Sequence, residues 1–448
     1  MRPGKQRKTG SGDLFRARLD QIIDMRHELV RLADRIDWDW IDGELAGRFS
    51  DEGRPGTEVR FMIGLFLLKH IHALSDEEVC ARWVENPYFQ YFTGEEFFQH
   101  RFPHERSGMS HWRKRIGDRL DVLLAESLRV AHAAGALKTE DLARVTVDTT
   151  VQPKNVTHPT DAKLMLTAVE KLGQMAKHHG LALRQSYVRV AQRAAMMAGR
   201  YAHAKQFKRC NRELRFLRTR LGRLIRDIRR KCAGDGALAE AFAGPLLKAE
   251  QIRDQRQQRR GWKLYSWHAP EVECIGKGKA HKPYEFGVKV SVVTTNRRCK
   301  GGQFVLHAKA LPGTPYDGHT LAEAIEQTEA LTGHAIERAY VDKGYRGHEA
   351  PNQHRVFISG QKRGVHGAIK RELRRRSAIE PVIGHMKNDG HLGRNYLKGY
   401  LGDQVNAVLS AVGYNFRLIL NWLRLLCALF LTAIFGPTPT QSAVRTPS

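Results

Sequence analysis

Hydrophobic residues recur at helical spacing along the first third of the chain. In residues 57–84, TEVRFMIGLFLLKHIHALSDEEVCARWV, the apolar positions follow a helical period that breaks near Ala73. Ser75 and Glu78 then form the S-x-x-E pattern of a capping box, which predicts that a second helix begins there. Similar spacing on either side predicts that residues 14–135 are helical.

A further helix is predicted to begin at Ser110, in SHWRKRIGDRLDVLL. Its first turns carry Trp112 and three cations, Arg113, Lys114 and Arg115. An aromatic residue beside three cations suits the recognition helix of a helix-turn-helix DNA-binding domain. An ordinary amphipathic helix with a solvated basic face explains the pattern equally well, so both interpretations stay open.

Strand-like runs recur from residue 143 onward, outside residues 162–260. β-Branched and apolar residues are concentrated in ARVTVDTT, EFGVKVSVVTT, FVLHAKAL, IERAYVD and VFIS. Helices are predicted for Thr320 to Leu331 and Gly367 to Lys387. This order of elements predicts an α/β fold, a mixed sheet flanked by helices, as in ribonuclease H-like nucleic-acid enzymes.

Residues 162–260 form a long basic helical block after the first predicted strand. Apolar residues recur there at alternating spacings of three and four, which is about the minimum run for a coiled coil: Phe207, Cys210, Leu214, Leu217, Leu221, Leu224 and Ile228. A helical hairpin packed within the chain is the first interpretation, and an intermolecular coiled coil is the second.

The charge of the chain indicates a polyanionic partner. Among 448 residues, 74 Lys and Arg against 47 Asp and Glu give a formal net charge of +27. The composition favours nucleic acid over an anionic membrane surface. The apolar stretch from Leu425 to Phe435 is too short to span a bilayer. Six scattered cysteines and the absence of a secretory signal favour a cytoplasmic, nucleoid-associated protein.

Three carboxylates are candidates for a metal site. Asp148 ends the first core strand and Asp342 ends the fourth, and adjacent strands would bring them together. A divalent cation resolves their repulsion, and oxygen ligands suit Mg²⁺ or Mn²⁺. Glu380 is placed to be the third acid, with Lys387 two turns later on the same helical face.

Each of these acids also has a structural interpretation. Asp148 and Asp342 could cap loops or turns, and Ser377 with Glu380 matches a second capping box. Asp317, in PYDGHT, is expected to cap the following helix, with a position near the metals as the alternative.

Three motifs give the chain a family resemblance: VDTT at Asp148, AYVDKGYRG at Asp342, and R-x3-E-x6-K formed by Arg376, Glu380 and Lys387. With them, the chain resembles bacterial insertion-sequence transposases of the Asp-Asp-Glu (DDE) class, which have a ribonuclease H-like core. Leu373 stands where the extended family signature has a tyrosine.

The resemblance implies a chemistry and a set of partners. Asp148, Asp342 and Glu380 would hold two Mg²⁺ ions, or Mn²⁺ as a substitute, while Arg376, Lys387 and Lys343 would contact phosphates. The partners would be double-stranded DNA, namely terminal inverted repeats and target DNA, and further copies of the chain, with no membrane and no nucleotide cofactor. The predicted reader of the repeats is the N-terminal region, through its three helical cations Arg113, Lys114 and Arg115, with the basic insertion as a second candidate.

Four regions are therefore predicted. Residues 1–135 form a helical DNA-binding domain, 140–161 with 262–420 a ribonuclease H-like catalytic domain, 162–261 a basic helical insertion, and 421–448 a C-terminal helix and disordered tail. The predicted function is that of a transposase that binds terminal inverted repeats and catalyses metal-dependent strand cleavage and strand transfer. A nuclease without strand transfer and a domesticated, non-catalytic DNA-binding protein are the alternatives.

Overall fold

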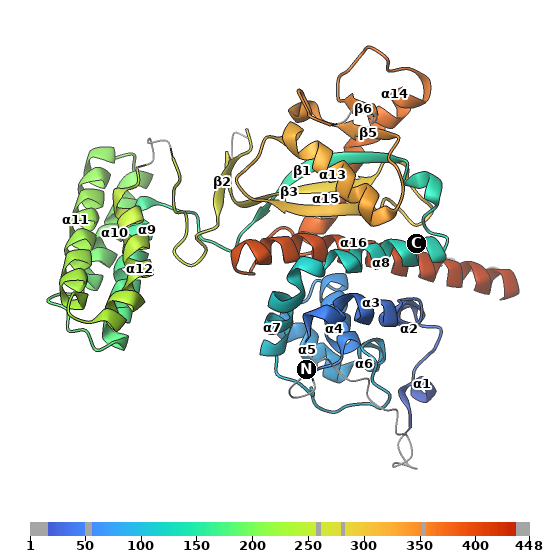
Figure 1. Cartoon of the computed structure of the whole chain (residues 1–448), viewed down its shortest axis with the longest axis horizontal. Helices are drawn as coiled ribbons and strands as arrows, with labels where there is room; N and C mark the ends of the chain where they lie inside the picture. The colour runs from blue at the N-terminus through green and yellow to red at the C-terminus, as the bar shows by residue number, and fades with distance from the viewer. Residues whose placement is uncertain (1–16, 50–55, 257–260, 279–282, 351–354, 436–448) are drawn as a thin grey trace, which may run out of the picture. The chain divides into compact units, whose positions relative to one another are not determined.

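The computed structural model describes residues 17–49, 56–256, 261–278, 283–350 and 355–435. Contacts divide them into two compact units (Figure 1). The core unit comprises the described residues up to Pro153 and from Val288 onward, and the insertion unit comprises Lys154–Gly287. Of the region predicted as a C-terminal helix and disordered tail, 421–448, residues 436–448 lie outside the described residues.

The N-terminal part of the core unit is helical, as predicted. An alanine with a left-handed backbone, Ala73 at φ 54°, separates α4 from α5. Ser75 and Glu78 form the predicted capping box, in which each side chain accepts from the other residue's backbone N–H. The predicted helix at Ser110 begins three residues earlier, as α7. The helices are α1 (Leu19–Ile22), α2 (Glu28–Ala33), α3 (Trp38–Leu45), α4 (Val59–Ile71), α5 (Asp76–Glu85), α6 (Pro87–Phe92), α7 (Ser107–Ile116) and α8 (Asp121–Ala133).

A six-stranded mixed sheet follows in the order β2-β3-β1-β5-β6, with β4 paired to β3. β1, β5 and β6 are parallel to one another, whereas β3 is antiparallel to both β2 and β4. The predicted mixed α/β architecture is confirmed, and β2 is a strand that the sequence pattern did not indicate. The strands are β1 (Arg144–Pro153), β2 (Glu273–Gly276), β3 (Tyr284–Thr295), β4 (Val305–Leu311), β5 (Arg338–Val341) and β6 (Arg355–Ile358).

Helices pack against the sheet in the core unit: α13 (Asp317–Thr332), α15 (Ile379–Asn388) and the long α16 (Gly399–Phe435). α16 contacts β4 as well as α2, α4 and α8, so the N-terminal helices and the sheet share one hydrophobic core. Buried Asn415 of α16 accepts from the backbone N–H of Val305 at 2.9 Å and donates to its carbonyl at 2.8 Å. None of the helices in the described ranges combines the length and hydrophobicity that crossing a membrane requires.

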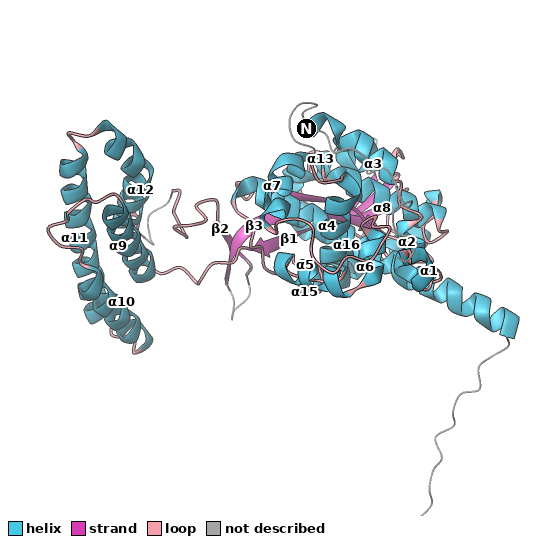
Figure 2. Cartoon of the chain, turned by 90° about the horizontal axis from the view of Figure 1, so that it is seen from below, coloured by secondary structure: helices cyan, strands magenta, loops and turns pink. Residues whose placement is uncertain are grey.

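The insertion unit contains four helices that run side by side, α9 (Asp161–His178), α10 (Val188–His203), α11 (Phe207–Cys232) and α12 (Gly236–Asp254) (Figure 2). They enclose a hydrophobic core of their own. The seam predicted on α11 faces this core, where Leu217, Leu221, Leu224 and Ile228 are fully buried, while Phe207 at the start of α11 is 62% exposed. Packing within the chain is therefore confirmed for this helix.

Candidate active site

Two aspartates lie side by side on adjacent parallel strands of the core unit. β1 pairs with β5 in a register that sets Thr146 beside Tyr340, so two residues further along Asp148 falls beside Asp342 on the same face. Asp342 directly follows β5, as predicted. Asp148 was expected to end its strand, but β1 continues to Pro153, so its carboxylate projects from within the strand.

The surroundings of Asp148 disfavour its charged form. Burial and, second, the negative charge of Asp342 raise the pKa of Asp148 to about 6. The backbone N–H of Thr149, at 2.8 Å, and the guanidinium of Arg376 act in the opposite direction. This paired arrangement is the one in which a cation would relieve repulsion between two carboxylates.

A third aspartate, Asp317, completes an acidic group around Gly344. A Cβ atom added to Gly344 would lie 2.9 Å from Oδ1 of Asp342 and 3.1 Å from Oδ2 of Asp317, so these two oxygens are at most 6.0 Å apart, the sum of the two distances. Oδ1 of Asp317 accepts from Oγ1 of Thr149 at 2.9 Å and from Nζ of Lys289 at 3.0 Å. Tyr316 occupies the cap position of α13, so the expectation that Asp317 caps this helix is wrong.

Arg376 links Asp148 to Glu380. Its Nη1 lies 3.4 Å from Oδ2 of Asp148, and its Nη2 lies 3.6 Å from Oε1 of Glu380. The Glu380 side chain is 67% exposed, whereas that of Arg376 is 15% exposed. Glu380 therefore reaches the edge of the acidic group from α15 while remaining open to solvent.

The capping interpretation of Glu380 is wrong. The chain between α14 (Gly367–Arg374) and α15 forms a short 3-10 helix, Arg375–Ala378. Within it, Oγ of Ser377 donates to the carbonyl of Arg374, and Ala378 occupies the cap position of α15 without a side-chain hydrogen bond. The carboxylate of Glu380 is thus not used by the start of its own helix.

Glu372, the nearest acid upstream on α14, has a different environment. Its side chain is 13% exposed, and it lies 2.9 Å from Arg338 and 3.4 Å from Arg144. It also accepts a hydrogen bond from the hydroxyl of Tyr340. These contacts join α14 to β1 and β5 and account for Glu372 structurally.

Tyr345 lies among the three aspartates without a hydrogen-bond partner. The side chain is fully buried, and its hydroxyl makes no hydrogen bond with any described residue. Burial, followed by the charges of Asp148, Asp317 and Asp342, raises the pKa of Tyr345 well above its ordinary value. Among the described residues, however, no three His, Cys, Asp or Glu side chains converge as metal ligands.

Comparison with known proteins identifies the family of the chain. Residues 17–115 match the family model described as Transposase domain (DUF772). A protein of Rhizobium meliloti, "Uncharacterized protein ORF8 in nfe locus", is 54% identical over 208 residues, which are 100% of that protein and 46% of this chain. The chain belongs to the transposase family. No solved structure matches the transposase.

The cations singled out in the sequence lie in different environments of the transposase. Lys343 is exposed directly after Asp342, and Lys387 is half-buried near the end of α15. On α7, Arg113 is buried and forms an ion pair with Asp76, with Nη2 to Oδ2 at 2.5 Å. Lys114 and Arg115 of the same helix are exposed, so the three cations of α7 are not equivalent.

Sequence reasoning missed three polar residues of this site. Thr149 follows Asp148 directly, Tyr345 lies within the DKGY motif, and Lys289 lies between two valines in the apolar part of β3. The isolated lysine in an apolar strand was a usable signal, because a charged group there needs a partner. Thr149 carried no signal of its own, since its partner Asp317 lies 168 residues away.

Proposed function

We propose that this transposase cleaves DNA at the terminal inverted repeats of its own insertion sequence and joins the ends to target DNA. In this proposal residues 140–161 and 262–420 form a ribonuclease H-like catalytic domain of the DDE class. Asp148, Asp342 and Glu380 are its catalytic acids. The observation that carries the proposal is the pairing of Asp148 with Asp342 on adjacent strands, with Glu380 joined to Asp148 through Arg376.

The donor set of these acids fits Mg²⁺, with Mn²⁺ as a substitute. The groups are hard carboxylate oxygens, and burial together with the charge of Asp342 raises the pKa of Asp148 to about 6 in spite of Arg376, so a cation beside the pair would be favourable. Asp148, Asp342 and Glu380 would hold two ions. When bound, such ions lower the pKa of a water molecule and stabilise charge on a phosphodiester undergoing in-line displacement.

The chain's own cations position the DNA in this proposal. Arg376 holds Asp148 and Glu380 with two nitrogens of one guanidinium, a geometry that also suits a phosphate. Lys343, next to Asp342 in the sequence, and Lys387, on the same helix as Glu380, supply further positive charge for phosphate contacts. Such prepositioned charge accounts for much of the catalysis in phosphoryl transfer.

Asp317 acts as a positioning residue. By accepting hydrogen bonds from Thr149 and Lys289, it ties the start of α13 to β1 and β3. The segment of β1 fixed in this way carries Asp148, so these bonds limit movement of the catalytic carboxylate.

Double-stranded DNA and further copies of the transposase are the proposed partners.

The test uses Asp342→Asn, which keeps an oxygen able to accept the 2.7 Å hydrogen bond from the backbone N–H of Gly344. Purified protein is incubated with Mg²⁺ and a labelled duplex that carries the ends of the element in which the gene lies. We expect strand cleavage to fall by at least about 100-fold, because a metal ion contributes several kcal/mol to the transition state.

The matched control is Glu323→Gln on α13, which also neutralises one carboxylate. Glu323 is 49% exposed and pairs with Lys309 outside the acidic group, so cleavage is expected to stay within about twofold of that of the natural chain. Full cleavage by Asp342→Asn at saturating Mg²⁺ contradicts the proposal. Cleavage without joining would instead favour a nuclease.

A further inference from the structure

The outward face of α11 carries a row of cations in two groups, with Thr219 between them. At about 100° per residue, Lys208, Arg212, Arg215, Arg223, Arg226 and Arg230 fall within an arc of about 80°, and all six are exposed. We call this set the α11 stripe. The buried residues Leu217, Leu221, Leu224 and Ile228 lie on the opposite side of the helix.

The stripe has the length of one turn of duplex DNA. Twenty-two residues separate its first and last members, and at 1.5 Å per residue they span about 33 Å. One turn of B-form DNA measures about 34–36 Å. A duplex lying along α11 would therefore meet positive charge over a full turn.

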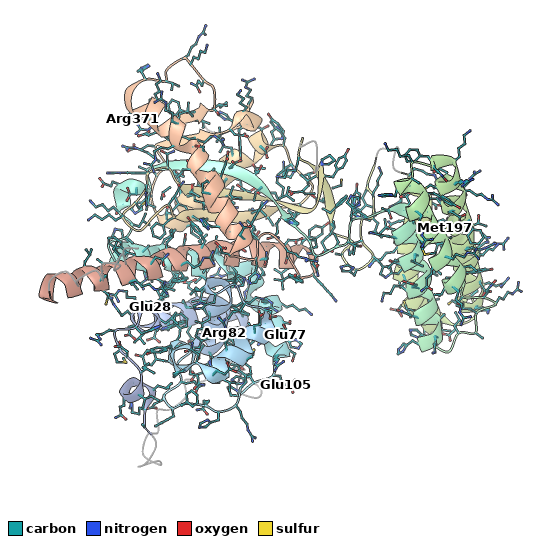
Figure 3. All side chains as sticks on the ribbon, turned by 180° about the vertical axis from the view of Figure 1, so that it is seen from behind. Glu28, Glu77, Arg82, Glu105, Met197 and Arg371 are labelled. Atoms are coloured by element: carbon teal, nitrogen blue, oxygen red, sulfur yellow. The ribbon has the colours of Figure 1, made fainter. Side chains whose placement is uncertain are left out.

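The charge of the stripe is largely uncompensated within the protein. Glu213 and Asp227 are the only acids in α11, and Asp227 pairs with Arg230 and Lys231. Arg212, Arg215, Arg223 and Arg226 form no ion pair with any residue that the structure describes. Figure 3 shows nitrogen-tipped side chains that point away from the ribbon of the insertion unit.

The neighbouring helix α10 repeats the pattern. Arg189, Arg193 and Arg200 are exposed, and α10 contains no acidic residue. Their spacing of four and seven residues places them on one face, opposite the buried Ala191 and Ala198. Two adjoining helices of the insertion unit thus present arginines to solvent.

Folding alone does not explain this arrangement. Arg212 with Arg215 and Arg223 with Arg226 are i,i+3 pairs of like charge, which destabilise a helix by a few tenths of a kcal/mol each. The core of the unit consists of apolar residues on the other face and does not need them. A polyanion that neutralises the row would remove this repulsion.

We propose that the α11 stripe binds the phosphodiester backbone of duplex DNA without reading its sequence. The inference rests on DNA being the substrate of the transposase, and it assigns to the insertion unit a share of the affinity separate from the catalytic acids. Guanidinium groups bind phosphates by charge and paired hydrogen bonds, and such contacts carry no base information.

The experiment measures binding of a random-sequence duplex of about 30 base pairs to the full-length chain over a series of salt concentrations. The test variant is Arg212→Gln, Arg215→Gln, Arg223→Gln and Arg226→Gln together. The matched control removes four cations from α9 and α12 of the same unit: Lys163→Gln, Lys171→Gln, Lys177→Gln and Lys248→Gln. Both proteins lose the same net charge.

The salt dependence distinguishes a contact from a general charge effect. The slope of log K against log salt is expected to become shallower by about 3.6 in the stripe variant, because each of the four lost phosphate contacts removes about 0.9, and by less than about 1 in the control. Replacing the same four arginines by lysine should retain most of the slope. Equal slopes for the stripe variant and the control overturn the inference.

Two further outcomes separate this inference from the proposed function. If the natural chain binds no duplex, the DNA-directed function itself fails. If it cleaves DNA while the stripe variant keeps the full slope, only the stripe is wrong. Melting curves check the fold, and the half variants Arg212→Gln with Arg215→Gln and Arg223→Gln with Arg226→Gln should each lose about half of the effect.

Discussion

The carboxyl group of Asp148 is subject to opposing influences in the folded chain. Burial and the charge of Asp342 raise its pKa to about 6, while Thr149 and Arg376 limit the rise. Between its ordinary pKa, 3.8, and about 6, the folded protein keeps a proton that the unfolded chain has lost. Stability should therefore fall as the pH rises through this window.

Asp148→Asn removes this penalty. Without added divalent cation, we expect the variant to be more stable than the natural chain by about 1–2 kcal/mol at pH 8, after allowing for the weakened contact with Arg376. The difference should shrink to a few tenths of a kcal/mol at pH 3.5, where the natural carboxyl is protonated in the folded state and about two thirds protonated in the unfolded state. Urea unfolding at both pH values measures it, and a difference independent of pH would contradict the assigned cause.

Neighbouring cations on α7 are predicted to have different roles. Arg113→Gln breaks a buried ion pair with Asp76 and should cost about 3 kcal/mol of unfolding free energy. Lys114→Gln alters an exposed side chain, so stability should change by less than about 0.5 kcal/mol while DNA affinity falls. Thermal melts and duplex binding of both variants test this. An Arg113→Gln protein of normal stability and weakened DNA binding would reverse the assignment.

At the level of elements, the features predicted correctly are those that residues close together in the sequence determine. The break at Ala73 and the Ser75 capping box depend on residues a few positions apart, and both are confirmed. β2 was missed because four residues form a strand only by pairing with β3. The extension of β1 to Pro153 was missed for the same reason, since β1 lies between β3 and β5.

The candidate site likewise has one feature that the sequence predicted and others that it did not. Strand order was enough to predict that Asp148 and Asp342 lie together, although the register of β1 against β5 pairs them, and Asp148 does not end its strand. The bonds of Asp317 to Thr149 and Lys289 join three elements distant in sequence, and no spacing rule reveals them. At Ser377 the local pattern misled, because the hydroxyl donates to Arg374 within a 3-10 turn.

At the scale of the whole molecule, charge and chemistry lie in different compact units. The acidic group belongs to the core unit, and the α11 stripe belongs to the insertion unit. Part of the net charge of +27 therefore lies on the α11 stripe, apart from the acidic group proposed for catalysis. This division allows binding and cleavage to be tested with separate variants of one chain.

The central claim is that Glu380 completes a catalytic triad with Asp148 and Asp342, and Glu372 offers a matched comparison. Both residues are glutamates on neighbouring helices, yet Glu380 is exposed beside Arg376, whereas Glu372 is held by Arg338, Arg144 and Tyr340. The decisive measurement is Mg²⁺-dependent cleavage of element-end DNA by Glu380→Gln and Glu372→Gln, with melting curves for each.

For Glu380→Gln we predict a loss of cleavage on the order of 100-fold or more with a nearly unchanged melting curve, because the proposed metal ligand is lost while its ion pair with Arg376 is exposed and contributes little to stability. For Glu372→Gln we predict a lower melting temperature and, below it, cleavage within a few-fold of normal. Near-normal cleavage by Glu380→Gln, or loss of cleavage confined to a stable Glu372→Gln protein, would contradict the account.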